Sequence, residues 1–222
     1  MKSILKIIIC ACLVFTFHLS PFTLNAQITH SDQGQVDKTA DALLKKAAGK
    51  FGNVSFTVTA AVLDSQKKET MRQTAQVLYC KGRYHLTMAD QAIICDGTTV
   101  WHWNKTAKEV AVTNMPADDD ANLFNPAQLL ANYGKSFRAK YIRTDDDGTA
   151  IVDLQPRSSR NYHKIRLFIV EKSGLLRRME VHKYDSGREI YDISAFKNAC
   201  TSASQFTFDA SKHPGVEIID MR

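Results

Sequence analysis

Histidine side chains are the first candidates for chemistry in this sequence, because they can bind metal ions and transfer protons. They are dispersed along the chain, and no two of them have the spacing of a metal-ligand pair. His85, His102, His163 and His182 fall in segments where polar and apolar residues alternate, which favours structural roles on strands. The histidines therefore predict no metal site.

Acidic residues form two clusters that could attract a cation. Asp145, Asp146 and Asp147 precede Gly148, but a calcium loop needs alternating ligands and a distal glutamate, which this segment lacks. We expect a solvated hairpin turn there, and residues 118–120 suit the first turn of a short helix. No glycine-rich phosphate loop follows a strand, and no serine or cysteine has an evident partner base. We therefore expect no enzymatic activity and no cofactor.

The start of the chain indicates export. Lys2 and Lys6 lead into an apolar run that ends near Leu19, and a small residue, Ala26, precedes a polar stretch. This order predicts a secretory signal peptide over residues 1–26. The run is shorter than the roughly 20 residues of a membrane span. An acylation site at Cys12, which would tether the chain to a membrane, is the alternative.

The expected mature chain, residues 27–222, is long enough for one domain with a sizeable core. It carries 27 basic and 23 acidic residues, a net charge of about +4, and the basic residues are scattered. Nucleic acid is therefore not an expected partner. Cys80, Cys95 and Cys200 remain after processing. They allow one disulfide, for which Cys80 and Cys95 are closest in sequence, or three half-buried thiols.

The mature chain begins with one predicted helix and continues with strands. Apolar residues recur at helical spacing from Val36 to Phe51, and Gly52 ends the pattern. The period then changes to two, which predicts strands. The predicted strands cover residues 55–62, 70–80, 83–88, 91–96, 99–104, 108–113, 137–144, 149–155, 163–171, 175–184 and 188–197.

Short, turn-rich connections such as Lys81-Gly82 and Asp96-Gly97 join these strands. Such connections link antiparallel neighbours, because a parallel crossover needs a dozen or more residues. About eleven strands in sequence must curl into a barrel or half-barrel to bury one face. One longer insertion, residues 116–136, carries a predicted helix that starts at Asn125-Pro126. The fold class is therefore mainly β, with an N-terminal helix and a helical insertion.

The most conspicuous side chains are apolar rather than reactive. Trp101 and Trp103 share one side of a predicted strand, either as core or as the lining of a cavity. The insertion offers the same choice between plain core and the underside of a lid, with Phe124, Leu129, Leu130 and Tyr133.

Several motifs resemble those of the LolA-type outer-membrane lipoprotein carriers. Residues 95–103 (CDGTTVWHW) resemble the hairpin that reads SDG, two residues, a hydrophobic residue, W, any residue and an aromatic one. Residues 83–86 (RYHL) resemble the strand before that hairpin, and 154–156 (LQP) a strand end. Residues 205–209 (QFTFD) and 215–220 (GVEIID) resemble the family's closing motifs. Their order spans the whole mature chain.

The resemblance implies an unclosed antiparallel barrel of about eleven strands that encloses a hydrophobic cavity for lipid chains. It also implies a monomeric periplasmic carrier, which receives acylated lipoproteins from an inner-membrane ABC-type release complex and delivers them to the outer membrane, to an acceptor where one exists. Lipid contact is then expected from the apolar side of the sheet and from the insertion. These residues are Phe56, Val58, Tyr84, Leu86, Met88, Trp101, Trp103, Phe124, Leu129, Leu130 and Tyr133.

One departure concerns the contact that closes the lid. The better-known members read K-R-P before the phenylalanine strand, and their arginine holds the lid through hydrogen bonds. This chain reads Lys81-Gly82-Arg83, so Lys81 or Arg83 replaces that arginine, or the latch differs. Two other readings share the fold: a regulator that senses lipid or lipoprotein, and a membrane-tethered lipoprotein acceptor.

Overall fold

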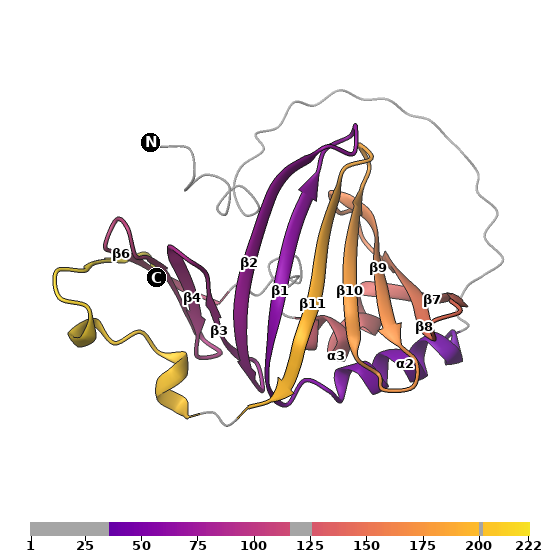
Figure 1. Ribbon diagram of the computed structural model, residues 1–222, viewed down its shortest axis with the longest axis horizontal. Helices are drawn as coiled ribbons and strands as arrows, with labels where there is room; N and C mark the ends of the chain where they lie inside the picture. The colour runs from indigo at the N-terminus through magenta and orange to yellow at the C-terminus, as the bar shows by residue number, and fades with distance from the viewer. Residues whose placement is uncertain (1–35, 116–125, 200–201) are drawn as a thin grey trace.

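A computed structural model of the protein describes residues 36–115, 126–199 and 202–222. These residues form one large sheet, two α-helices and two short 3-10 helices (Figure 1). The helices are α2 (Lys38–Ala48), α3 (Pro126–Ser136), η2 (Ala203–Phe206) and η3 (Ala210–Lys212). The strands are β1 (Asn53–Leu63), β2 (Glu69–Cys80), β3 (Arg83–Thr87), β4 (Gln91–Cys95), β5 (Thr99–Asn104), β6 (Glu109–Asn114), β7 (Phe137–Thr144), β8 (Thr149–Pro156), β9 (Tyr162–Val170), β10 (Leu176–Lys183), β11 (Arg188–Asn198) and β12 (Glu217–Asp220).

All twelve strands belong to one sheet, in the order β12-β6-β5-β4-β3-β2-β1-β11-β10-β9-β8-β7. Two antiparallel meanders, β1–β6 and β7–β11, are joined by the pairing of β1 with β11. The sheet is an unclosed barrel, as predicted, and its two edges are β12 and β7. The predicted eleven strands are all present within one or two residues of their expected ends. The twelfth strand, β12, pairs parallel to β6.

The strand connections are the tight turns that the sequence predicts. Lys81 and Gly82 have φ angles of 48° and 90°, and Gly97 has 102°. Glycine adopts such angles without steric cost, whereas an L-residue such as Lys81 is strained there. A further positive φ, 50° at Ala195, marks an extra residue in β11, where the register with β1 shifts between Ser55 and Thr57. Such bulges increase the local bend of a strand.

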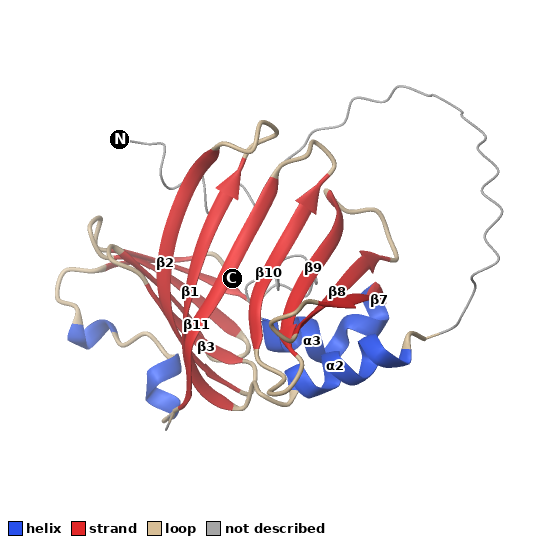
Figure 2. Ribbon diagram, turned by 45° about the vertical axis from the view of Figure 1, so that its right-hand side comes forward, coloured by secondary structure: helices blue, strands red, loops and turns tan. Residues whose placement is uncertain are grey.

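The two faces of the sheet have different surroundings. We call the face that carries Phe56, Val77 and Leu86 the inner face, and the opposite face the outer face. The main hydrophobic core lies on the inner face, between the sheet and the two helices. Figure 2 shows α2 and α3 side by side near the β7 edge, and β3–β6 turned relative to β1, β2 and β11.

Helix α2 is shorter than the sequence predicts. Asp37 caps it, because its carboxylate accepts hydrogen bonds from the backbone N–H groups of Thr39 and Ala40 at 3.1 and 3.0 Å. The helix ends at Ala48, and its C-cap is Gly49. This cap lies three residues before Gly52, where the sequence pattern ends. Val36 precedes the cap and is 65% exposed, so it is not part of the buried stripe. In the described part of the chain, neither α-helix is long and apolar enough to cross a membrane.

Candidate functional site

The inner face brings together four of the residues predicted to contact lipid. Phe56 is in register with Val77, and Val77 with Leu86, so their side chains point to the same side. Val58 and Tyr84 lie on this face by alternation and are half-buried against the core. The sheet therefore presents a continuous apolar surface from β1 to β3, part of which the core does not cover.

Helix α3 contributes residues that the sequence predicts to the core on this face. Leu129 and Leu130 are buried in the core, and Tyr133 packs against it half-buried. Met88 is buried at the turn after β3 but is not in the main core cluster. Phe124 lies outside the described residues.

The predicted orientation of the tryptophans is wrong. Leu86 pairs with Ile93 on β4, and Ile93 pairs with His102 on β5. His102 and Val100 therefore face inward, whereas Trp101 and Trp103 lie on the outer face. Alternation along one strand groups residues but does not decide which group faces in, and a shift of one residue exchanges the two. Counting partners through the two hairpins from Leu86 would have given the correct face.

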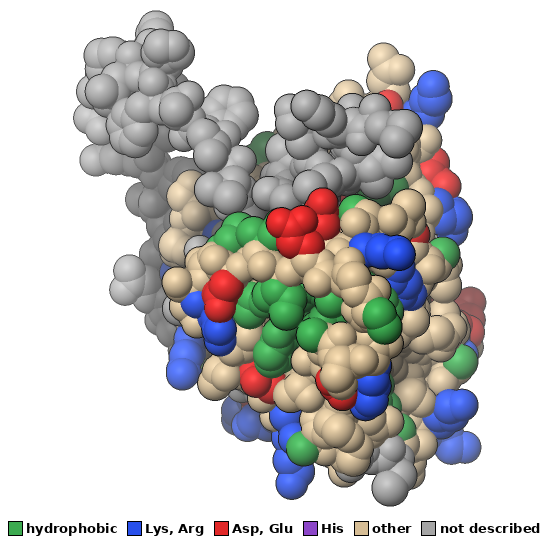
Figure 3. All heavy atoms as spheres, turned by 90° about the vertical axis from the view of Figure 1, so that its left-hand side faces the viewer, with side chains coloured by type: hydrophobic (Ala, Val, Ile, Leu, Met, Phe, Trp, Pro, Cys, Tyr) green, Lys and Arg blue, Asp and Glu red, His purple; other side chains and the backbone are tan. Residues whose placement is uncertain are grey.

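The outer face of β3–β6 has an aromatic cluster of its own. The ring of Trp103 lies 5.5 Å from Phe208 and 4.1 Å from His213, centroid to centroid. Phe206 is buried beneath the guanidinium of Arg83, whose central carbon lies 4.9 Å from the ring centroid. The C-terminal segment thus packs across this face. Figure 3, viewed from the side of β6 and this segment, shows apolar side chains gathered among charged ones.

The two latch candidates lie at the β2–β3 turn and at the first residue of β3. Arg83 points to the outer face, where its guanidinium lies 3.1 Å from the sulfur of Cys80. Lys81 occupies the exposed turn between β2 and β3. Arg83 is therefore on the face opposite to Leu86 and the main core.

A different pair fixes helix α3 to helix α2. The hydroxyl of Tyr133 donates a hydrogen bond of 2.6 Å to the carboxylate of Asp41, which also pairs with Lys45 at 2.8 Å. The contacts with Lys45 and Tyr133 lower the pKa of Asp41. Burial, together with the Asp41 carboxylate, raises the pKa of Tyr133 to about 12. Since the pair joins residues 92 positions apart, local sequence patterns give no sign of it.

Helix α2 is attached to the sheet through its N-cap residue, Asp37. The second carboxylate oxygen of Asp37 accepts a hydrogen bond of 2.8 Å from the backbone N–H of Tyr141 on β7. Backbone N–H groups, chiefly those of Ala40 and Tyr141, lower the pKa of Asp37. One side chain thus caps α2 and holds it against the β7 edge.

Cys80 and Cys95 are both buried, and they are not bonded to each other. Cys80 is in register with Arg83, whereas Cys95 is in register with Tyr84, so the two thiols point to opposite faces. They also lie two strands apart, about 9.6 Å, which exceeds the reach of a disulfide. Cys200 lies outside the described residues.

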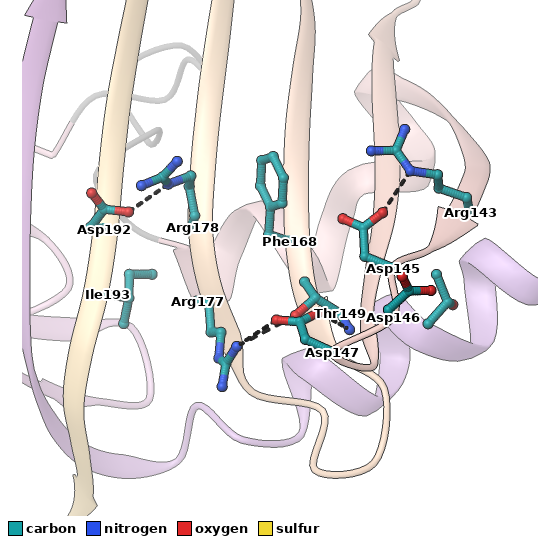
Figure 4. A pocket seen from close by; sticks show the side chains of 11 residues that line it. Arg143, Asp145, Asp146, Asp147, Thr149, Phe168, Arg177, Arg178, Asp192 and Ile193 are labelled. Atoms are coloured by element: carbon teal, nitrogen blue, oxygen red, sulfur yellow. Dashed lines mark hydrogen bonds and ion pairs between the residues drawn. The ribbon is translucent and has the colours of Figure 1, made fainter.

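A polar cleft of about 910 Å³ lies beside the β7–β8 turn (Figure 4). Its arginines are matched by aspartates at 2.6 to 3.2 Å: Arg143 with Asp145, Arg177 with Asp147 and Arg178 with Asp192. Because these charges are paired with one another, the cleft offers no concentrated charge to a ligand. Gly148 donates to the carbonyl of Asp145 at 2.9 Å, which confirms the predicted hairpin turn.

The chemistry of the site is therefore apolar. No group of three or more histidine, cysteine, aspartate or glutamate side chains within the described ranges could hold a metal ion. The inner face offers half-buried aliphatic and aromatic side chains, which suit hydrocarbon ligands.

Comparison with known proteins decides the family. The model of the family "Outer membrane lipoprotein carrier protein LolA" matches residues 81–209. This chain belongs to the LolA family. The LolA match covers β3 to β11, and with them α3 and the predicted hairpin motif.

Individual relatives agree with this LolA assignment. An outer-membrane lipoprotein carrier protein of Histophilus somni (strain 2336) is 24% identical over 183 residues, 81% of this chain and 86% of the relative. One from Pectobacterium carotovorum subsp. carotovorum (strain PC1) is 28% identical over 134 residues, 60% and 62% of the two chains. An uncharacterized conserved protein from Thermus thermophilus shares the fold, with a TM-score of 0.55, 8% identity and coverage of 82% and 99%.

Proposed function

We propose that this protein carries the acyl chains of lipoproteins across the periplasm, from the inner to the outer membrane. The observation that carries the proposal is the open inner face of the sheet, which two helices cover near one edge and which continues as apolar surface beyond them. Membership of the LolA family supports the same function. The protein acts as a binding protein and not as an enzyme.

The energetics of the cargo explain why a carrier is needed. Three acyl chains contain on the order of 40 methylene groups, and exposing each to water costs about 0.8 kcal/mol. A lipoprotein therefore does not cross an aqueous compartment unaided, and even partial shielding stabilises it strongly. In this proposal the shielding surface combines the sheet and α3, with Phe56, Val58, Tyr84, Leu86, Leu129, Leu130 and Tyr133.

Cargo release requires that the covering helices move. We assign the restraint on that movement to the hydrogen bond between Tyr133 and Asp41, since it joins α3 to α2 above the core. Breaking a single part-buried hydrogen bond is a small cost that a partner can supply. The donor is an inner-membrane ABC-type release complex, and the recipient is the outer membrane or an acceptor in it. After removal of residues 1–26 the carrier is a periplasmic monomer that needs no nucleotide of its own.

The proposal is tested by isolating the protein from periplasm together with its cargo. Native mass spectrometry of the purified chain is expected to show complexes with acylated proteins or lipopeptides. Val58→Asp, which places a charge on the inner face, should reduce the bound fraction about tenfold or more. Thr57→Asp is the matched control, because Thr57 is the neighbouring residue on the outer face. A wild-type chain without bound lipid, or equal loss in both variants, would contradict the proposal.

The same spectrum decides between the soluble carrier and a tethered acceptor. The carrier is expected to begin at Gln27, which excludes acylation at Cys12. Deleting the gene should then cause lipoproteins to accumulate in the inner membrane.

A further inference from the structure

Exposed apolar side chains gather at the C-terminal edge of the sheet. Among the described residues, five large hydrophobic side chains are well exposed, and three of them lie in or directly after β12. Ile218 is 52% exposed, Ile219 41% and Met221 59%. Natural edge strands usually carry charged side chains or a covering segment. The exposed apolar residues on this edge strand therefore indicate a binding role.

The register divides these three residues between the two faces. Ile219 pairs with Ala111 of β6, which pairs with the inward-facing His102. Ile218 pairs with Val110, which pairs with Trp103 on the outer face. Met221 follows Ile219 by two residues and continues the ladder, since its N–H donates to the carbonyl of Val112 at 2.9 Å. Ile219 and Met221 thus face inward, and Ile218 faces outward.

Ile219 is the last member of a row that crosses the inner face. The row contains one residue from each strand between β1 and β12: Phe56, Val77, Leu86, Ile93, His102, Ala111 and Ile219. Exposure along it rises from 2% at Phe56 and 6% at Val77 to 41% at Ile219. The proposed lipid surface is therefore covered at one end and reaches solvent at the sheet edge, with His102 as its polar interruption.

The length of this row exceeds that of an acyl chain. Six steps between neighbouring strands, each about 4.8 Å, give about 29 Å. A single acyl chain spans half the hydrocarbon core of a bilayer, about 15 Å. A chain whose end rests against Phe56 thus reaches about as far as β4 and does not contact Ile219. The edge residues meet the chain as it passes and not when it is seated.

We propose that the acyl chains of the lipoprotein enter and leave the inner face across the β12 edge, past Ile219 and Met221. This inference rests on the proposed function and adds the path to it. Residues that touch the cargo only in transit change the rates of binding and release together. They leave the affinity unaltered, because the bound and free states are unaffected.

Stopped-flow fluorescence with a synthetic triacylated lipopeptide, labelled on its peptide, tests the path. Ile219→Asp is expected to lower the association and dissociation rates of the lipopeptide about tenfold each, because the chain must pass a charged group. The dissociation constant should stay within a factor of about two. Ile218→Asp is the matched control on the same strand and the opposite face, and it should keep both wild-type rates. Met221→Asp should act as Ile219→Asp does.

Several outcomes would overturn the path. Equal slowing by Ile218→Asp and Ile219→Asp would show that the edge strand itself, and not the inward side chain, matters. Wild-type rates in both Ile219→Asp and Met221→Asp would exclude passage across this edge. A short-chain phospholipid serves as a second probe. If Ile219→Asp slowed the binding and release of this phospholipid alone, and not of the lipopeptide, passage of lipoprotein chains across this edge would be excluded. Ile219→Ser serves if the aspartate variant fails to fold, as judged by circular dichroism.

The outcomes also separate this inference from the proposed function. A wild-type chain that binds no lipopeptide contradicts both. A wild-type chain that binds, loses affinity in Val58→Asp and keeps its rates in Ile219→Asp contradicts the path alone.

Discussion

At the scale of single residues, the contact between Tyr133 and Asp41 is the one to which the proposed function assigns the restraint on cargo release. The tyrosine hydroxyl and the carboxylate are 2.6 Å apart and come from the two helices that cover the inner face. Removing the hydroxyl deletes this hydrogen bond between α3 and α2 and leaves the aromatic ring in its place against the core. The carboxylate keeps Lys45 as its partner, so it is not left without compensation.

Tyr133→Phe is therefore expected to lower the midpoint of thermal unfolding by a few degrees and to speed lipopeptide release several-fold. The measurements are thermal unfolding followed by circular dichroism and dissociation in stopped flow. Tyr141→Phe is the control, because that hydroxyl interacts with Thr144 of the same strand, at 2.9 Å, and joins no helices. Release at the wild-type rate in Tyr133→Phe would remove the latch assignment.

At the scale of elements, the sequence predicts most of the secondary structure because the determinants are local. Apolar periodicity and turn residues give both helices and eleven strands, and Asn125-Pro126 marks where α3 begins. The sequence does not predict β12, because its four residues, EIID, show no polar–apolar alternation and no hairpin turn connects them to β6. Its apolar residues become informative only when the register assigns each one to a face.

The cap of α2 provides a prediction for this element. Asp37→Ala removes hydrogen bonds to the helix N-terminus and to Tyr141, and should cost about 1 kcal/mol of unfolding free energy at neutral pH. Asp37→Asn retains most capping and should cost less. Urea unfolding of the three chains measures this. Equal stability of the alanine variant and the wild type would contradict the anchoring role.

The same cap gives the sign of a pH dependence. The folded-state pKa of Asp37 is lowered from its ordinary value of 3.8, so its contribution is present above that value. The contribution is lost as the pH falls through the folded-state pKa. The stability difference between wild type and Asp37→Ala should therefore shrink in acid below about pH 4.

At the scale of the whole molecule, the sheet separates the face proposed to bind lipid from a face that the C-terminal segment covers, and sequence patterns predict only part of this division. Sequence patterns group the inner-face residues of β1 and β3 and those of α3, because each set belongs to an apolar stripe, and their contact with lipid stays a prediction. Alternation predicts the wrong face for the tryptophans, because it identifies which side chains share a face, whereas pairing through successive hairpins decides where that face points. The bond between Tyr133 and Asp41 depends on how two distant helices meet, which no local pattern encodes.

This division makes a prediction about intrinsic fluorescence. The chain has two tryptophans, and both lie on the outer face, where Trp103 packs against Phe208 and His213. Tryptophan emission should therefore report on the C-terminal segment and stay nearly constant when unlabelled lipopeptide binds to the inner face. Phe208→Ala, which uncovers Trp103, should shift the emission to the red at unchanged lipopeptide affinity. Lipopeptide bound beside the tryptophans would shift their emission to the blue. A blue shift at saturating lipopeptide would therefore show that the cargo binds on the outer face.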